Sequence, residues 1–504
     1  MDRGDFLEKE KIEKAKICKK DKWKLAALVF GVVLLISIVL YGQEGKEKYI
    51  EKKEKKETAV ETELEAPKNI RVLLKNSDYS SIYHQEVVIS SDKVLKITEG
   101  EEVKQVATGQ AFSLKWEKET EENAMEKNKK TTEDSGSNNN RRLLEGGKLS
   151  IASISRGQSV PVYEGKLEIY STAQGYVLVN EVDFETYVKG VIPGEMPVSY
   201  EEEALKAQSI CARTYAYMKL NGEKSYPEYG ADLDDSVQYQ VYKSQQDNER
   251  TDQAVEETKG EILTYQGNIA ATYYFSTSWG YTTGMDAWLK EDIPYLAATA
   301  VGEAGELSNF EEVFLNPEGT FYEETEPWYR WQLVIDLIEN KEALFQHLTE
   351  EQKENPGTVL IWKEKEKAYV EGAPAAFDQI RNIAVTKRGS GGVACTLEII
   401  TDKQKIQVSG QHMIRQLLAF PSNQIVRQDG SVVKNFSLLP SGFFILELEK
   451  EKENVKGLKL TGGGFGHGAG MSQNGANQMA KLGKDYQEIL LFFYQGTEIG
   501  CLQE

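Results

Sequence analysis

Glu195, in the segment Val191-Ile-Pro-Gly-Glu-Met-Pro197, is the residue whose setting best suits acid–base chemistry. The two prolines restrict the backbone around it and the glycine allows conformations that other residues avoid, a combination that is costly in an ordinary surface loop. The apolar side chain of Met196 would favour the protonated, proton-donating form of a neighbouring carboxyl group, whereas the dipole of the helix that follows would favour the ionised form, and the sequence does not decide between the two. Most of the chain's 80 acidic residues are expected to be solvated surface groups. The local sequence therefore singles out Glu195 as a candidate acid or base.

A second segment is rich in glycine and reads Gly462-Gly-Gly-Phe-Gly-His-Gly-Ala-Gly-Met-Ser-Gln-Asn-Gly475. Glycine at this density indicates tight turns and close approach of the backbone to another group. A phosphate-binding loop is excluded, because no lysine follows at the required spacing and no dinucleotide fingerprint lies between a strand and a helix. His467 is either a packed histidine or, with Ser472 and Gln473 beside it, part of a polar site.

A third segment, Tyr274-Phe-Ser-Thr-Ser-Trp-Gly280, interleaves hydroxyl groups with aromatic rings. The simplest interpretation is a strand whose side chains alternate between two faces. The alternative is a sugar-binding surface, because aromatic rings pack against sugar rings and the hydroxyls of Ser276 and Ser278 form hydrogen bonds.

The elements that must position these segments are predicted from hydrophobic periodicity. The clearest helix follows Glu195: a capping box of Ser199 and Glu202 begins it, and Asn221-Gly222 ends it. Pro193 and Pro197 then place Glu195 on a turn just ahead of this half-buried helix. Short strands are expected at residues 70–74, 87–89, 94–97 and 112–116, between 149 and 182, and at 262–265, 271–279, 383–387, 395–400 and 405–408.

Two further helices are expected in the second half of the chain. One spans residues 328–348, and the other begins at a capping box of Asp485 with Glu488 close to the C-terminus.

The first part of the chain predicts a membrane anchor. Residues 25–41 carry no charge and reach the short end of the roughly 17 to 25 residues that span a bilayer. Trp23 and Tyr41 flank them as interfacial aromatics, and the lysines before them favour a cytoplasmic N-terminus. No small-residue cleavage site follows, which favours an uncleaved anchor. Residues 42–66, in which Glu and Lys are the commonest residues, cannot build a core and indicate a solvated stalk.

Composition narrows the classes of partner and cofactor. A formal net charge of −20 argues against binding to nucleic acid. The 4 cysteines are far apart, without the paired spacing of a zinc site or a dense disulfide framework.

We therefore expect an α+β protein of the following organisation. Residues 1–24 are a cytoplasmic basic segment, 25–41 the transmembrane anchor and 42–66 the stalk. Residues 67–504 form a mixed, strand-rich extracytoplasmic domain, with a helix after the catalytic turn and a helical C-terminus. Insertions are expected near residues 117–147 and 300–378.

The three segments, in their order along the chain, resemble the stage II sporulation protein D and amidase enhancer family. The resemblance extends from about Ile70 to Leu502. The resemblance implies a lytic transglycosylase, anchored in the cell membrane, that acts on peptidoglycan glycan strands during cell-wall remodelling linked to sporulation. Its most specific parts are Val182-Asp-Phe-Glu-Thr-Tyr-Val-Lys-Gly-Val-Ile-Pro-Gly-Glu-Met-Pro197, Glu203-Ala-Leu-Lys-Ala-Gln-Ser-Ile-Cys-Ala-Arg-Thr-Tyr215 and Gly464-Phe-Gly-His-Gly-Ala-Gly-Met-Ser-Gln-Asn-Gly-Ala476.

The resemblance also implies roles for individual residues. Glu195 matches the catalytic glutamate of the family's Glu-Met-Pro motif and would act first as acid and then as base. Some family members bind zinc through His and Cys after the long helix, but residues 233–242 contain neither here, so we expect no metal and no cofactor. Arg213 is a candidate substrate contact, with a structural ion pair as its alternative. The other candidate substrate-binding residues are Ser276, Ser278, His467, Ser472 and Gln473.

Two other functions stay open from the sequence. A non-catalytic glycan-binding protein could stimulate a cell-wall amidase, as the enhancer name implies. Hydrolysis by water would need a second carboxylate, for which Asp232, Asp234 and Asp235 are available. The expected partners are glycan strands and, through the resemblance, a cell-wall amidase or membrane proteins.

Overall fold

The structure is a computed structural model that describes residues 64–117, 140–157, 159–242 and 248–503. The chain divides into two units, Met1–Leu64 and Glu65–Glu504. The predicted anchor at 25–41 and nearly all of the predicted stalk lie outside the described residues. Within the described ranges, no helix is both long and apolar enough to cross a membrane. The second unit is a strand-rich mixture of helices and strands, which confirms the expected α+β class.

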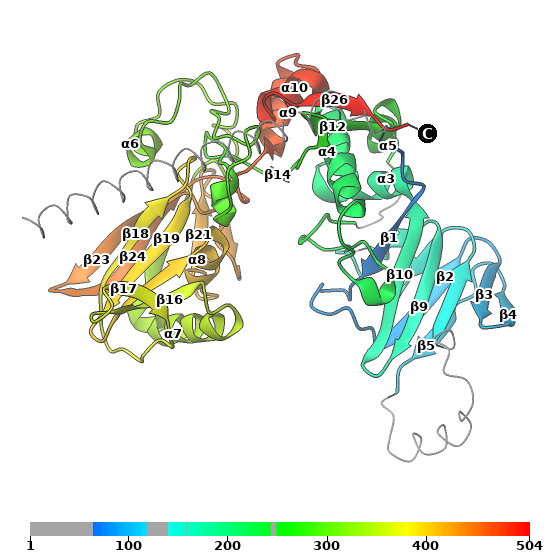
Figure 1. Cartoon of the computed structure of the whole chain (residues 1–504), viewed down its shortest axis with the longest axis horizontal. Coiled ribbons are helices and arrows are strands. Elements are labelled where there is room, and N and C mark those ends of the chain that lie inside the picture. Colours follow the sequence, from blue (N-terminus) through cyan, green and yellow to red (C-terminus); the bar gives the residue numbers. More distant parts are fainter. Residues whose placement is uncertain (1–63, 118–139, 158, 243–247, 504) are drawn as a thin grey trace, which may run out of the picture. The chain divides into compact units, whose positions relative to one another are not determined.

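Two sheets form the first part of the second unit (Figure 1). The larger has the strand order β11-β1-β10-β9-β6-β3-β4, and the smaller has the order β5-β2-β7-β8. Alternating burial along β2 explains why such sequences form strands with one face in the core. The strands are β1 Asn69–Leu74, β2 Glu86–Ser91, β3 Leu95–Glu99, β4 Glu102–Val106, β5 Phe112–Lys115, β6 Arg141–Glu145, β7 Leu149–Ile151, β8 Val162–Tyr163, β9 Lys166–Thr172, β10 Gly175–Asp183 and β11 Leu233–Asp234.

Helix α4 is the centre of the helical part that follows. It packs against α3, α5, α9, α10 and strand β12, so it is buried on almost every side rather than half buried as predicted. The elements here are α3 Phe184–Glu195, α4 Glu202–Leu220, η1 Pro227–Tyr229, α5 Glu249–Glu257, β12 Glu261–Tyr265, β13 Asn268–Ile269, β14 Tyr274–Phe275, η2 Met285–Trp288, β25 Met471–Ser472, α9 Gln473–Lys481, α10 Tyr486–Phe493 and β26 Glu498–Cys501.

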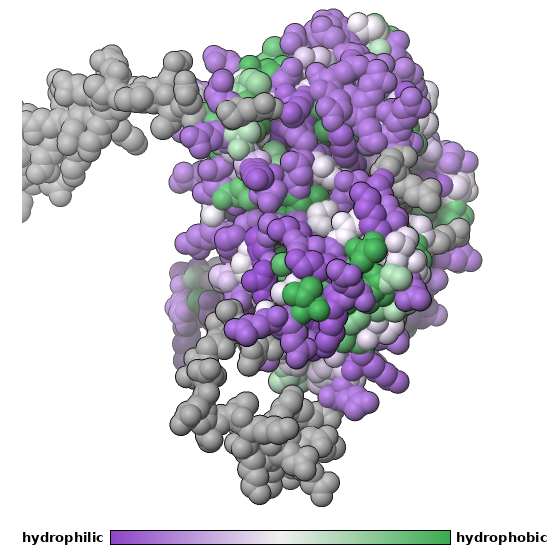
Figure 2. Space-filling view, turned by 90° about the vertical axis from the view of Figure 1, so that its right-hand side faces the viewer, coloured by the Kyte–Doolittle hydropathy of each residue, from purple (hydrophilic) through white to green (hydrophobic). Residues whose placement is uncertain are grey.

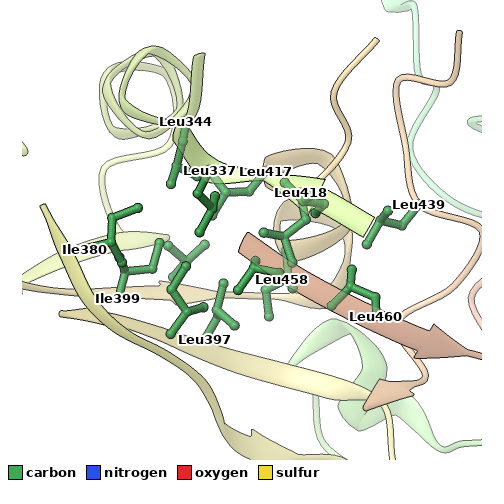
Figure 3. Packing of buried hydrophobic residues seen from close by; sticks show 14 of the residues in the cluster. Leu337, Leu344, Ile380, Leu397, Ile399, Leu417, Leu418, Leu439, Leu458 and Leu460 are labelled. Carbon is green, nitrogen blue, oxygen red and sulfur yellow. The ribbon is translucent and has the colours of Figure 1, made fainter. Parts of the chain in front are cut away.

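Two five-stranded sheets, β22-β21-β15-β24-β23 and β17-β16-β20-β19-β18, share one hydrophobic core with α7 and α8. Figure 3 shows Leu344 of α7, Leu417 of α8, Leu397 of β19 and Leu458 of β24 in this core. The elements are α6 Phe310–Leu315, β15 Trp331–Asp336, α7 Leu337–Glu354, β16 Val359–Lys363, β17 Ala368–Glu371, β18 Ile380–Arg388, β19 Ala394–Thr401, β20 Lys405–Ser409, α8 Gln411–Leu417, β21 Gln424–Arg427, β22 Val432–Lys434, β23 Phe444–Glu451 and β24 Asn454–Gly462.

Most of the surface seen in Figure 2 is hydrophilic, as the charge-rich composition predicts. Hydrophilic residues cover most of the face in Figure 2, and apolar residues appear there in small separate groups rather than in one broad patch. This is the surface expected of a chain with 28% charged residues.

Several predicted elements differ from the observed ones. The segment predicted to be helical at 328–348 begins with strand β15, because Trp331, Leu333 and Ile335 alternate with exposed residues. The strand predicted at 271–279 is reduced to Tyr274–Phe275, which pairs in parallel with Met471–Ser472.

The two predicted capping boxes have opposite outcomes. The box of Asp485 and Glu488 is confirmed at the start of α10. The predicted box of Ser199 and Glu202 is wrong, since α4 begins after Glu201 without a side-chain cap. The C-terminal end is also less helical than predicted, because strand β26 follows α10.

Candidate functional site

Glu195 is the last residue of helix α3, and the prediction of a turn ahead of α4 is wrong. The helix begins after Asp183, whose side chain accepts a hydrogen bond from the first turn. It continues through Pro193, although proline removes one backbone donor. Burial of residues such as Tyr187 and Val188 along one face stabilises the helix despite this loss. Packing therefore outweighs the local preference for an extended chain before a proline.

Two glycines of α3 leave room for the segment that contacts the Glu195 carboxylate. A Cβ atom on Gly194 would lie 2.4 Å from the carbonyl oxygen of Val241, and one on Gly190 would lie 2.5 Å from the ring of Tyr242. With this close approach, the backbone N–H of Val241 donates a hydrogen bond to Oε1 of Glu195. The glycine that precedes Glu195 is therefore needed for contact between backbones, and the contact orients the carboxylate.

Gln473 connects the glycine-rich segment to Glu195. Its Nε2 donates to the backbone carbonyl of Glu195 at 2.9 Å and to Oε1 of Gln208 at 3.2 Å. On the opposite flank, Gln240 accepts a hydrogen bond from the Tyr187 hydroxyl and donates one to the Tyr274 hydroxyl, each at 3.2 Å. Glu195 thus lies where α3, the segment before residue 243 and the start of α9 meet.

Three tyrosines lie near the Glu195 carboxylate. Burial, and after it the negative charge of Glu195, raises the pKa of Tyr274 well above its ordinary value. Burial is also the main cause of the raised pKa values of Tyr187 and Tyr215, with a smaller contribution from Glu195. These phenols are therefore neutral hydrogen-bonding groups at physiological pH.

A buried carboxyl group that the sequence did not single out, Glu323, joins the second and third segments. Its Oε1 accepts a hydrogen bond from the Ser472 hydroxyl at 2.6 Å, and its Oε2 accepts one from the Ser278 hydroxyl. The backbone N–H of Ser278 donates to the same carboxyl group at 3.1 Å. These contacts connect residues that are far apart in sequence, so no local pattern in the acid-rich tract around Glu323 could have found it.

Glu323 is 0% exposed, and none of the ion pairs between described residues involves it. Burial raises the pKa of Glu323 to about 7, although the hydrogen bonds from Ser278 and Ser472 favour the charged form. This residue lies in the 300–378 region that the sequence presented as an insertion.

The three candidate serines have different positions. Ser278 and Ser472 are 2% and 0% exposed, and both hydroxyls bind Glu323, so they position the backbone around the site. Ser276 is partly exposed, and its carbonyl accepts a hydrogen bond from the N–H of Asn474 at 3.0 Å. Of these serines, Ser276 alone is accessible to a ligand.

His467 has the contacts of a packed histidine. Its Nδ1 accepts a hydrogen bond from the N–H of Ala469 at 3.1 Å, so the neutral ring carries its proton on Nε2. The ring centre lies 4.9 Å from that of Trp288 and 5.7 Å from that of Phe275. Burial, followed by the charge of Arg415, lowers the pKa of His467 to about 4. At neutral pH the imidazole is therefore uncharged.

The aromatic rings of the third segment are buried. Phe275 is 5% exposed, and Trp279 is 1% exposed within a cluster that includes Phe310 and Phe443. These two rings are therefore not available to pack against a sugar, because Phe275 lies against His467 and the aromatic cluster covers Trp279.

Arg213 occupies a structural ion pair. Its side chain is 0% exposed, and its Nε and Nη2 atoms each lie 2.8 Å from the Glu185 carboxylate. Nη2 also donates to the carbonyl of Val255 at 3.1 Å, and Nη1 donates to that of Glu261 at 3.2 Å. These partners connect α4 to α3, α5 and β12.

The three aspartates considered for water activation are also occupied. Asp235 pairs with Arg156, and both side chains are fully buried. Lys75 lies 3.4 Å from Asp234, and Lys224 lies 2.9 Å from Asp232. Among the described residues, no three His, Cys, Asp or Glu side chains gather as metal ligands would. The ion pairs leave none of these aspartates available beside Glu195 as a second carboxylate.

Comparison with known proteins agrees with the predicted resemblance. Residues 172–265, which include Glu195 and α4, match the family model described as Stage II sporulation protein. Residues 358–470 match a model described as Domain of unknown function (DUF8618). The resemblance of the chain to the stage II sporulation protein D and amidase enhancer family is thereby confirmed.

Three curated relatives are each 28% identical to the chain. One is an uncharacterised protein of Brachyspira hyodysenteriae, with 67% of this chain and 72% of the relative aligned. Another is Stage II sporulation protein D of Bacillus subtilis, with 66% of this chain and 78% of the relative aligned. The third is the Amidase enhancer of Bacillus subtilis, where the match covers 62% of this chain and 40% of the relative. The chain thus spans less than half the length of the amidase enhancer.

Proposed function

We propose that this protein is a lytic transglycosylase that cleaves peptidoglycan glycan strands, with Glu195 as its acid and base. The observation that carries the proposal is the placement of Glu195. Its carboxylate is oriented by the N–H of Val241, and its backbone is held by Gln473. The segment that contains Glu195 and the glycine-rich segment that contains Gln473, two of the three candidate segments, therefore meet at Glu195.

The reaction needs one such group. Glu195 donates its proton to the oxygen between muramic acid and glucosamine while the bond from that oxygen to C1 of muramic acid breaks, and the bonding electrons leave with the oxygen. The 6-hydroxyl oxygen of the same muramic acid then forms a bond to C1, and its proton returns to Glu195. The product ends in a 1,6-anhydro sugar. An internal nucleophile removes the need for a second carboxylate that activates water.

Neighbouring groups support this chemistry. The neutral phenols of Tyr187, Tyr215 and Tyr274 supply hydrogen-bonding dipoles near the developing positive charge, and the ionised Glu195 stabilises that charge once its proton has left. Gln473 is a positioning residue, because it acts through the backbone of Glu195.

The test compares full-length wild-type protein with Glu195→Gln on purified glycan strands and analyses the ends of the products by mass spectrometry. We expect anhydro ends with the wild type and none with the variant, which is close in shape to the original side chain. Glu201→Gln is the matched control, since Glu201 is an exposed acid at the start of α4. Reducing ends would instead indicate hydrolysis by water.

The second candidate function is that of a glycan-binding enhancer of a cell-wall amidase. The similarity to the Bacillus subtilis protein named Amidase enhancer favours it. Under this alternative, both wild type and Glu195→Gln bind strands without cleaving them, and both raise the rate of an added amidase equally.

We also propose that residues 25–41 anchor the protein in the cell membrane and that residues 42–66 form a stalk. Residues 67–504 would then lie outside the cytoplasm, where peptidoglycan is found. The uncharged run at 25–41 supports this proposal. Protease added to intact cells whose wall has been removed should digest residues 67–504 and leave the basic N-terminal segment protected.

A further inference from the structure

An exposed aromatic pair is connected to the proposed active site through a series of hydrogen-bonded residues. Phe465, in the glycine-rich segment, is 41% exposed, and its ring stacks on that of Trp328 with centres 4.8 Å apart and planes 21° apart. Trp328 is itself partly exposed, and it lies between α6 and β15. These rings, unlike those of Phe275 and Trp279, are available to a ligand.

The backbone around Phe465 is firmly held. Its N–H and carbonyl both bond to Thr277, at 2.8 and 3.1 Å. The N–H of Gly464 bonds to the carbonyl of Trp328 at 2.9 Å, and the carbonyl of Gly464 accepts a hydrogen bond from Trp331 at 3.2 Å. Single exposed apolar residues are common. A large ring held in water on a backbone with this many constraints is a preformed contact surface.

Hydrogen bonds and one peptide bond link this pair to the backbone of Glu195. Thr277, which is bonded to Phe465, accepts a hydrogen bond from Nδ2 of Asn474 at 2.9 Å. Asn474 directly follows Gln473, the residue that holds the backbone of Glu195. Phe465 and Glu195 are therefore both anchored to the first turn of α9.

A cation completes the surface. The guanidinium carbon of Arg427 lies 5.1 Å from the ring centre of Trp328. Nε of Arg427 donates to the hydroxyl of Ser431 at 2.6 Å, while the terminal nitrogens have no hydrogen-bond partner in the described part of the chain. Asp429 lies 3.9 Å from Nε, on the side of the group that is already occupied. Paired terminal nitrogens of an arginine are suited to a carboxylate.

We propose that Phe465, Trp328 and Arg427 form a further sugar subsite that takes an amino sugar carrying a carboxylate, such as a muramic acid residue of the glycan strand. This inference rests on the proposed function for its substrate. A sugar ring presents an apolar C–H face that packs on an aromatic ring. The lactyl carboxylate of muramic acid would bind the terminal nitrogens of Arg427. Although the protein has a net negative charge, Arg427 would thus provide a local positive charge for the anionic glycan strand.

The test measures binding of full-length protein in mild detergent, with Glu195→Gln present in every variant so that the strands stay intact. The two probes are glycan strands without stem peptides, which carry carboxylates, and chitin oligosaccharides, which are uncharged. Phe465→Ala should weaken binding of both probes roughly tenfold, as loss of an aromatic anchor does. Phe465→Trp should restore it. Arg427→Gln should weaken binding of the glycan strands alone, with an effect that shrinks as salt rises.

Leu491→Ala is the matched control, because Leu491 is 43% exposed and lies on α10. If Phe465→Ala binds each probe as tightly as Leu491→Ala does, the proposal is overturned. The aromatic pair of Phe465 and Trp328 would then be a contact for a protein partner. The same holds if neither probe binds. Cleavage is measured separately with Glu195 intact. Loss of strand binding in Phe465→Ala without any anhydro ends from the wild type would refute the lyase and support the subsite.

Discussion

Replacement of Glu323 by glutamine tests the buried carboxyl group that joins two parts of the site. Glu323 accepts hydrogen bonds from Ser278 and Ser472 and is fully buried. Glutamine has the same shape, but it offers one acceptor oxygen and one donor group. The Ser472 hydroxyl can accept from that donor and turn to the carbonyl of Ser276, which lies 3.4 Å away. Glu323→Gln should therefore fold, and it should resemble the protonated wild type.

The magnitude follows from the pKa. Burial raises the pKa of Glu323 from 4.5 to about 7. Between these two pH values the folded chain holds more protons than the unfolded chain, so the free energy of unfolding falls as pH rises. The stabilising contribution is fully present below pH 4.5 and is lost as pH rises through 7. The difference corresponds to about 3 kcal/mol.

The assay compares unfolding of wild type and Glu323→Gln from pH 4.5 to 8.5. Other groups titrate alike in both proteins, so the difference between the curves reports Glu323. The wild type should lose about 3 kcal/mol relative to the variant over this range, or about 3 °C in melting temperature for a unit of this size. Glu324→Gln is the control, because Glu324 is exposed in the same turn, and its curve should run parallel to that of the wild type.

A difference between wild type and Glu323→Gln that stays constant with pH would refute the reasoning. It would mean that Glu323 keeps an ordinary pKa and that water or a cation reaches its carboxylate. A difference of opposite sign, with the wild type gaining stability as pH rises, would mean that the hydrogen bonds from Ser278 and Ser472 outweigh burial.

Three further predictions concern single residues of the site. Gly194→Ala should lower the rate of anhydro-end formation at least tenfold and also lower the melting temperature, because the new Cβ would lie 2.4 Å from the Val241 carbonyl oxygen and displace that backbone. Gly222→Ala, with its nearest neighbouring atom 3.5 Å away, is the control and should change neither. Arg213→Met should cost roughly 3–5 kcal/mol in urea unfolding by leaving its carboxylate partner unpaired, whereas unchanged stability with lost glycan binding would make it a substrate contact. His467→Gln should leave the pH–rate profile unchanged between pH 5 and 8, since the pKa of His467 is about 4, and loss of an inflection near pH 6.5 would contradict this.

Local sequence patterns predicted the secondary structure correctly where interactions between residues close in sequence determine it. Alternation of apolar residues predicted strands such as β2 and β3, and the side-chain pair of Asp485 and Glu488 predicted the start of α10. The same approach failed at Pro193, where a proline lies inside a helix. There the burial of a helix face contributes more than the local preference of the backbone.

By itself, the sequence determined the three candidate segments, the acid in the first of them and the α+β class, because these depend on residue type, spacing and periodicity. Only the tertiary structure decided which side chains of those segments are accessible. It buried Trp279, Ser278 and Ser472, and it brought Glu323 to them from another part of the chain. It left Phe465 exposed next to Trp328. The physical reason is that burial and pKa depend on contacts between segments far apart in sequence, and a local pattern of residues carries no record of those contacts.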